Sequence, residues 1–80
     1  MDRDKEEEDK KEKEIRAVEA TVIGIASDEE AVQLLHDRVP ARLIVDLLVR
    51  ESVVDSSKPI SITHRALSDL VEKLRRRARA

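Results

Sequence analysis

Residues 40–54 read PARLIVDLLVRESVV, and this apolar stretch decides the fold. Its charged residues Arg42, Asp46 and Arg50 recur every four positions, so on a helix they would form one narrow polar stripe with two ion pairs. Aliphatic residues occupy the rest of the circumference, and a helix that is apolar on most sides is buried on most sides. In a chain of 80 residues we therefore expect a central helix or a helix at a dimer interface.

Residues 15–26, IRAVEATVIGIA, carry two conflicting signals. Four aliphatic residues are spaced by three, four and three positions, as on one face of a helix: Ile15, Val18, Val22 and Ile25. Residues 21–25 are β-branched except for Gly24, and this composition is typical of strands. We expect a helix over residues 10–20 and extended or irregular chain over residues 21–26.

Two further helices have clear start signals. Ser27 followed by Glu30 forms a capping box, which predicts a helix over residues 28–38. Thr63 is a cap for a last helix from His64 to about Arg79. The apolar face of that helix has the spacing i, i+3, i+4 and i+7 and consists of Leu67, Leu70, Val71 and Leu74.

The predicted fold class is all-α, a predominantly helical small domain of three to four helices that assembles as a dimeric bundle. An α+β fold with strands at 16–26 and 42–54 is the alternative, because short apolar runs fit both periods. Residues 1–14 are almost continuously charged and are expected to be a disordered tail, with residues 15–80 as a single helical domain. The Glu and Lys residues of this tail also suit the exposed first part of a longer helix.

The core must be aliphatic, because the chain has no Phe, Trp, Tyr or Cys. A small interior without disulfides is the situation in which self-association helps most. We therefore expect a homo-oligomer or a complex with a partner protein's helix. The candidate contact face comprises the most apolar positions of the two longest aliphatic segments: Leu43, Ile44, Leu47, Leu48, Leu67, Leu70, Val71 and Leu74.

Charge is sorted along the chain: residues 1–63 sum to −6 and residues 64–80 to +4, which gives the net charge of −2. A basic helix can contact phosphates, whose attraction to cations does not depend on base sequence. The candidate phosphate contacts are Arg65, Lys73, Arg75, Arg76, Arg77 and Arg79. The helix dipole alone also favours cations at a helix C-terminus, which accounts for this cluster without any ligand. Nucleic acid is therefore the alternative partner.

Other classes of function find no support in the sequence. Gly24 is the sole glycine, which excludes a glycine-rich phosphate loop, and there is no Gly-x-Ser-x-Gly motif. His36 and His64 without any Cys make a poor metal set. We expect no catalytic residue, metal, cofactor or small-molecule substrate. No apolar run is long enough to span a membrane and nothing resembles a signal peptide, so we expect an intracellular protein, cytoplasmic or nuclear/nucleoid.

These observations favour a non-catalytic helical protein-interaction or regulatory module that acts through self-association or through binding a partner helix. The alternative is a small dimeric nucleic-acid-binding protein, similar to a transcription regulator, that docks its basic C-terminal helix on phosphates.

Overall fold

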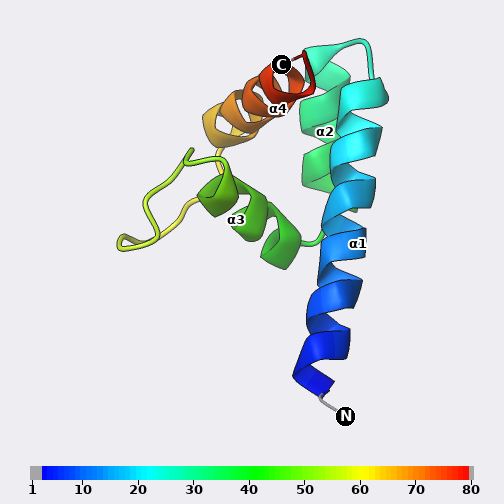
Figure 1. The fold of residues 1–80 in the computed structure, drawn as a ribbon. Coiled ribbons are helices and arrows are strands. Elements are labelled where there is room, and N and C mark those ends of the chain that lie inside the picture. The colour runs from blue at the N-terminus through cyan, green and yellow to red at the C-terminus, as the bar shows by residue number, and fades with distance from the viewer. Residues whose placement is uncertain (1–2, 80) are drawn as a thin grey trace.

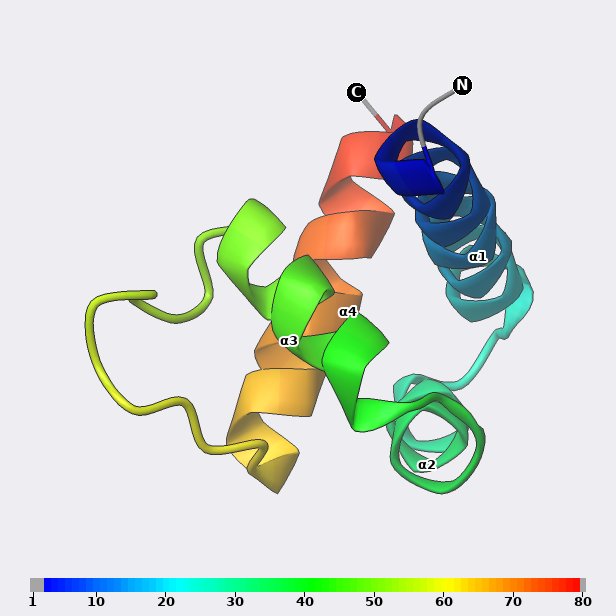
Figure 2. The same ribbon diagram turned by 90° about the horizontal axis from the view of Figure 1, so that it is seen from below.

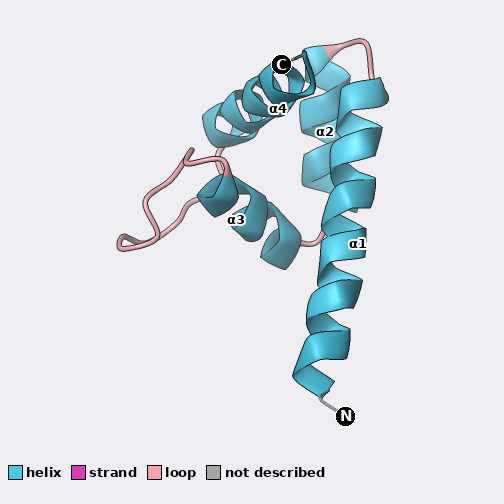
Figure 3. Cartoon of the chain, in the orientation of Figure 1, coloured by secondary structure: helices cyan, strands magenta, loops and turns pink. Residues whose placement is uncertain are grey.

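The computed structural model describes the backbone of residues 3–79 and the side chains of residues 9–79. Four helices account for the regular structure of this part of the chain, in the order α1 (Arg3–Gly24), α2 (Asp28–Arg38), α3 (Ala41–Arg50) and α4 (His64–Arg79). The all-α prediction is confirmed, and Figure 3 shows only helices and loops among the described residues. The α+β alternative is wrong, because its strand segments 16–26 and 42–54 lie mostly in α1 and α3.

Helix α1 continues through the β-branched segment to Gly24, so the expectation of extended or irregular chain over 21–26 is wrong for its first four residues. The reason is tertiary: Ile15 and Val22 are fully buried in the core, and helical geometry is what places both on one face. Thr21 is accommodated because its hydroxyl donates a 2.8 Å hydrogen bond to the carbonyl of Ala17, one turn earlier.

The charged N-terminal segment is helical from Arg3 onward and forms the first half of α1, as in the alternative interpretation of these residues. Residues 1 and 2 of the expected tail lie outside the described residues. At 1.5 Å per residue, the 22 residues of α1 span about 33 Å, which makes it the longest helix of the chain. Figure 1 shows its N-terminal part extending beyond the other helices.

Helix α2 begins as the capping signal predicts. Ser27 is extended and its hydroxyl accepts a 3.4 Å hydrogen bond from the backbone N–H of Glu30. The predicted bounds 28–38 are confirmed, and Ala31, Val32 and Leu35 form the buried face.

Helix α3 starts after Pro40 and stops at Arg50, one turn earlier than the apolar run suggests. The chain leaves the helix at Ser52, whose φ of 57° is in the left-handed region that glycine usually occupies. Two hydrogen bonds close this end: Ser52 N–H donates to Val49 O at 3.1 Å, and Val53 N–H to Leu48 O at 2.9 Å. This is a Schellman motif. It turns Val53 back onto the core.

An irregular segment, residues 51–63, connects α3 to α4 and bulges away from the helices (Figure 2). Asp55 forms its tight turn by accepting hydrogen bonds from Ser57, at 2.9 Å from the amide and 2.8 Å from the hydroxyl. Thr63 then caps α4, because its hydroxyl accepts a 3.0 Å hydrogen bond from the N–H of Ala66.

Helix α4 packs on all three other helices, most extensively on α2 and α1 (Figures 1 and 2). The buried core is entirely aliphatic and contains Ile15, Val22, Ala31, Val32, Leu35, Leu43, Ile44, Leu47, Leu48, Ala66, Leu67, Leu70, Val71 and Leu74. None of the helices in the described residues is both long and apolar enough to cross a membrane.

Candidate functional site

The C-terminal cations, which the sequence marks as candidate phosphate contacts, separate into two groups of three. Lys73 belongs to the first group, whose side chains turn back onto the molecule. Its ammonium donates to the carbonyl oxygens of Glu51 at 2.8 Å and Ser52 at 3.5 Å. Those carbonyls end α3, where a cation is favourable because of the helix dipole. Lys73 therefore ties the end of α3 to α4.

Arg75 holds the connection between α1 and α2. Its Nε lies 2.8 Å from Oδ1 of Asp28, and its terminal NH₂ donates to the carbonyl of Ile25. Only 18% of the Arg75 side chain is exposed, against 73% for Asp28. The guanidinium thus lies between the helices and contacts Asp28 and the Ile25 carbonyl of this chain.

Arg77 bridges two carboxylates from distant parts of the sequence. It lies 2.7 Å from Oε2 of Glu19 on α1 and 2.7 Å from Oε2 of Glu51 at the end of α3. The hydrogen bond that Arg77 donates to Glu19 is the main cause that raises the pKa of Arg77. Together with Lys73 and Arg75, it forms what we call the cation clamp, which ties α1, α2 and α3 to α4.

The second group, Arg65, Arg76 and Arg79, is exposed to solvent. Arg76 pairs with Glu72 one turn earlier at 2.6 Å, and its side chain remains 74% exposed. Arg65 and Arg79 form no ion pair with any side chain of residues 9–79. The exposed face of α4 also carries Asp69 and Glu72, so two acids lie between Arg65 and the arginines at the end of the helix. This face is a weaker attractor of phosphate than the formal charge of the segment suggests.

The candidate self-association face is buried inside the single chain. All eight of its members are at most 3% exposed: Leu43, Ile44, Leu47, Leu48, Leu67, Leu70, Val71 and Leu74. They belong to one core, to which α1 and α2 also contribute. A second copy or a partner helix would therefore have to use a different surface of this fold.

A polar seam between α1 and α3 was not anticipated from the sequence. Arg42, Asp46 and Arg50 do not satisfy one another along α3. They pair instead with α1, Arg42 with Glu14 at 3.2 Å, Asp46 with Lys11, and Arg50 with both oxygens of Glu12. These pairs tie α3 to residues 11–14 of α1, and the hydrogen bond that Arg50 donates is the main cause that lowers the pKa of Glu12.

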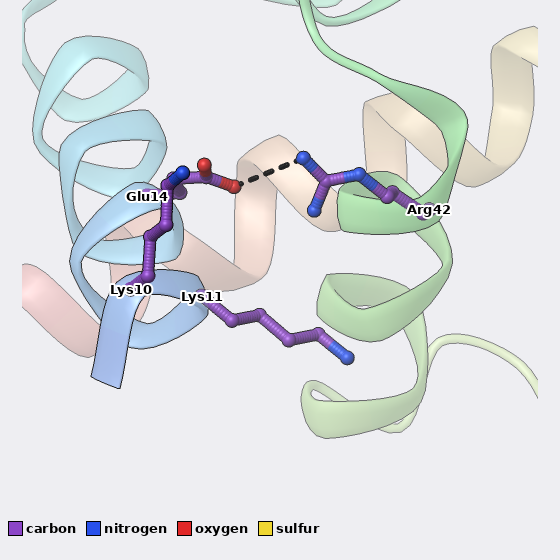
Figure 4. A pocket seen from close by; sticks show the side chains of 4 residues that line it. All are labelled: Lys10, Lys11, Glu14 and Arg42. Atoms are coloured by element: carbon purple, nitrogen blue, oxygen red, sulfur yellow. Dashed lines mark hydrogen bonds and ion pairs between the residues drawn. The ribbon is translucent and has the colours of Figure 1, made fainter. Parts of the chain in front are cut away.

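This seam borders a shallow hollow of about 310 Å³ between α1 and α3 (Figure 4). Lys10 and Glu14 lie side by side on α1, Arg42 reaches across from α3, and Lys11 extends toward α3 below them. Because Lys11 and Arg42 are already paired, the hollow offers a ligand little charge beyond that of Lys10.

A second open hollow lies near the start of α2 and the end of α4, with a volume of about 480 Å³. Three arginines and two carboxylates line it together with one alanine: Ala26, Asp28, Glu72, Arg75, Arg76 and Arg79. Two of the arginines already contact the two carboxylates, so this hollow also presents no concentrated charge.

The histidines do not assemble a site. The His36 ring lies 3.0 Å from Asp37, and this hydrogen bond is the main cause that lowers the pKa of Asp37. His64 is exposed at the start of α4. Among the described residues, no group of three or more His, Asp or Glu side chains is placed to hold a metal ion.

The outward face of α1 is the feature that sequence reasoning missed. Between residues 17 and 24 the exposed positions of this helix carry no charge, although 42% of the chain is charged. They are Ala17, Ala20, Thr21, Ile23 and Gly24, which we call the α1 outer patch. Ile23 is 39% exposed and is one of two large apolar side chains exposed among residues 9–79. The spacing of these residues places them on the side of α1 opposite its buried face. This can be read from the sequence only once the segment is known to be helical.

Comparison with protein-family models, curated proteins and solved structures finds no match to this chain.

Proposed function

We propose that this chain is a small non-catalytic interaction module that acts by self-association. The observation that carries the proposal is the α1 outer patch, an uncharged and exposed helix surface in a chain that is otherwise densely charged. Contiguous exposed apolar surface on a small protein is characteristic of sites of protein association.

The composition of the core supports the same proposal. Its fourteen buried residues are all aliphatic, and six further aliphatic side chains around them are only partly covered. A chain of this size buries a smaller fraction of its surface than larger domains do, so covering one more helix face would stabilise the fold appreciably.

Sedimentation velocity on the full chain from micromolar to millimolar concentration tests this function. We expect the mass to rise from the 9.1 kDa of one chain toward twice that value, with little effect of salt because the contact is apolar. A mass that stays at 9.1 kDa throughout would refute self-association.

Nucleic-acid binding is a second candidate function, favoured by the exposure of Arg65, Arg76 and Arg79 on α4. Electrostatic binding to phosphates falls steeply as salt rises. Fluorescence anisotropy with a labelled DNA or RNA oligonucleotide should therefore show binding that weakens with salt. Replacing Arg65, Arg76 and Arg79 together by Gln should abolish that binding without unfolding the protein. Binding that survives in this variant would exclude these three arginines as the phosphate contacts.

A further inference from the structure

We propose that residues 59–63 form an exposed backbone edge that binds an extended acidic peptide of a partner protein, which adds to it as a β-strand. This edge, which we call the 59–63 edge, is separate from the α1 outer patch. The proposal therefore goes beyond self-association and does not depend on it. Three observations carry it: a row of backbone groups without partners, an exposed isoleucine within that row, and cations at both of its ends.

The backbone of the 59–63 edge is straight and unpaired. These residues end the connection between α3 and α4, and they contain no helix, turn or bend. Proline at position 59 and β-branched residues at positions 60, 62 and 63 favour this extended conformation. Within residues 3–79, the N–H groups of residues 60–63 and the carbonyls of residues 59–62 form no hydrogen bond to protein. An unpaired edge of this kind is a template for the addition of another strand.

The 59–63 edge is also held in place before any peptide binds. The connection starts on the core, against which Val53 and Val54 pack, and returns to it at Ile60. Thr63 then anchors the end of the edge as the cap of α4. Irregular connections as long as residues 51–63 are uncommon and are usually either functional or disordered. Because this one is anchored on the core, it fits a binding role, and its fixed conformation lowers the entropic cost of binding.

Ile62 gives the edge an apolar contact surface. It is 36% exposed, and the connection that carries it lies on the side of the molecule away from α1 and α2 (Figures 1 and 2). Side chains alternate along an extended segment, so Ile60 and Ile62 lie on one face and Ser61 on the other. Ile60 packs against the core, so an added strand would place every second side chain beside Ile62 and the margin of the core. The peptide should therefore carry aliphatic residues at alternate positions.

Charge selects an acidic peptide as the occupant. Residues 58–65 contain Lys58, His64 and Arg65 but no acid, in a chain that has 18 acids. Lys58 and Arg65 are exposed, and neither forms an ion pair with a side chain of residues 9–79. A peptide with acids at both ends would neutralise a cation at each end of the edge, and cross-strand pairs of opposite charge are favourable.

The nearest acids of the chain leave these cations free. Asp55 precedes Lys58 by three positions and already accepts hydrogen bonds from Ser57. Asp69 follows Arg65 by one turn of α4 but forms no ion pair with it. The same segment of a second copy is a poorer occupant, because an antiparallel pair centred on position 61 opposes position 58 to position 64, both basic. A parallel pair opposes each basic residue to itself.

Amide hydrogen exchange, followed residue by residue by NMR on the full chain, tests the 59–63 edge. The probe is a short synthetic peptide in which Val and Thr alternate between acidic ends, Asp-Glu-Val-Thr-Val-Thr-Val-Glu-Asp. Only alternate residues of an extended segment direct their N–H groups to the same neighbouring strand. We expect the saturated complex to slow exchange by about tenfold or more at positions 60 and 62, or at positions 61 and 63, but not at both pairs.

The other outcomes of this experiment overturn the proposal. Binding that protects none of these amides, or all four equally, would exclude strand addition. Protection that is already present in the free chain and increases with protein concentration would place a second copy on the edge instead of a peptide. Absence of binding up to millimolar peptide would refute the site.

Charge reversal provides matched variants. Lys58→Glu combined with Arg65→Glu should weaken binding of the acidic peptide about tenfold, because attraction becomes repulsion at both ends of the edge. Arg76→Glu combined with Arg79→Glu makes the same change of charge near the end of α4 and should leave the affinity unchanged. All four positions are exposed, so circular dichroism should show a folded chain in both double variants.

The selectivity for acids has its own control. A peptide of the same alternating sequence with Lys at both ends should bind about tenfold more weakly than the acidic one. Equal binding of the two peptides would refute selection by charge. Equal losses in the two double variants would reduce the effect to general attraction by the whole protein and overturn the 59–63 edge as the site.

Discussion

Two adjacent arginines on α4 are expected to differ sharply in their effect on stability. Arg75 is inserted between helices, with 18% of its side chain exposed, whereas Arg76 is 74% exposed and pairs only within its own helix. Replacing each by Met keeps the aliphatic stem and helix propensity but removes the charge and its hydrogen bonds. The pair of variants therefore separates the cation clamp from the basic surface of the same helix.

The magnitude follows from the contacts that each variant loses. Arg75→Met breaks the 2.8 Å contact with Asp28 and the hydrogen bond to the Ile25 carbonyl. A hydrogen bond to a charged group contributes about 1.5–3 kcal/mol, and here the bond to the Ile25 carbonyl is the one of this kind, since Arg75 Nε meets Asp28 as an ion pair without hydrogen-bond geometry. Asp28 is largely exposed and regains water once the arginine is gone, so we expect a net loss of about 2 kcal/mol, or a Tm lower by about 10 °C for a domain of this size. Arg76→Met loses an exposed i,i+4 pair, for which about 0.3–0.5 kcal/mol is typical.

Thermal unfolding followed by circular dichroism measures the difference, with both variants at one protein concentration because association raises Tm. The gap between them should persist at high salt, since screening weakens exposed pairs more than shielded ones. Equal melting temperatures for Arg75→Met and Arg76→Met would refute the clamp. Arg75 would then count among the cations that are available to contact a ligand.

Three further predictions concern the core, a helix end and acid stability. Leu47→Ala removes a fully buried side chain and should lower the free energy of unfolding by about 2–5 kcal/mol; a urea midpoint equal to that of wild type would contradict the packing described here. Ser52→Gly should raise the free energy of unfolding by about 0.5–1 kcal/mol, because glycine adopts the left-handed conformation at the end of α3 without steric cost, and an unchanged or lower midpoint in the same titration would count against the Schellman motif. Glu12 has a lowered pKa in the folded state, so its pairing with Arg50 stabilises the fold above the ordinary carboxyl pKa and is lost as pH falls through the lowered value. Melting temperatures between neutral pH and pH ~3 should therefore fall less in Glu12→Gln than in wild type, and parallel curves would exclude this pair as a source of acid sensitivity.

The cation clamp changes how the basic C-terminus is to be interpreted. Half of the cations that distinguish this segment in the sequence are held by groups of the other helices: Arg75 and Arg77 pair with Asp28, Glu19 and Glu51, and Lys73 donates to carbonyls at the end of α3. A substitution that removes all the arginines of α4 would therefore destabilise the fold as well as change its surface. Loss of binding in such a variant would not show that the arginines contact a ligand.

Local signals in the sequence were sufficient for the elements whose ends depend on neighbouring residues. The hydroxyls of Ser27 and Thr63 cap α2 and α4 where predicted, because a helix start requires an acceptor only three residues away. The apolar face of α4 was also predictable, since side chains three and four positions apart share one side of a helix.

What only the tertiary structure decided is the set of partners that each face meets. The β-branched end of α1 is helical because Val22 completes a core that other helices supply, and intrinsic propensity is too small to oppose such burial. Arg42 and Arg77 bind carboxylates 28 and 26 or more positions away, and no spacing rule within one helix reaches so far. Periodicity states which residues lie together on a helix, whereas the packing of four helices determines which of those faces are buried, which charges are neutralised and which surface of α1 remains open.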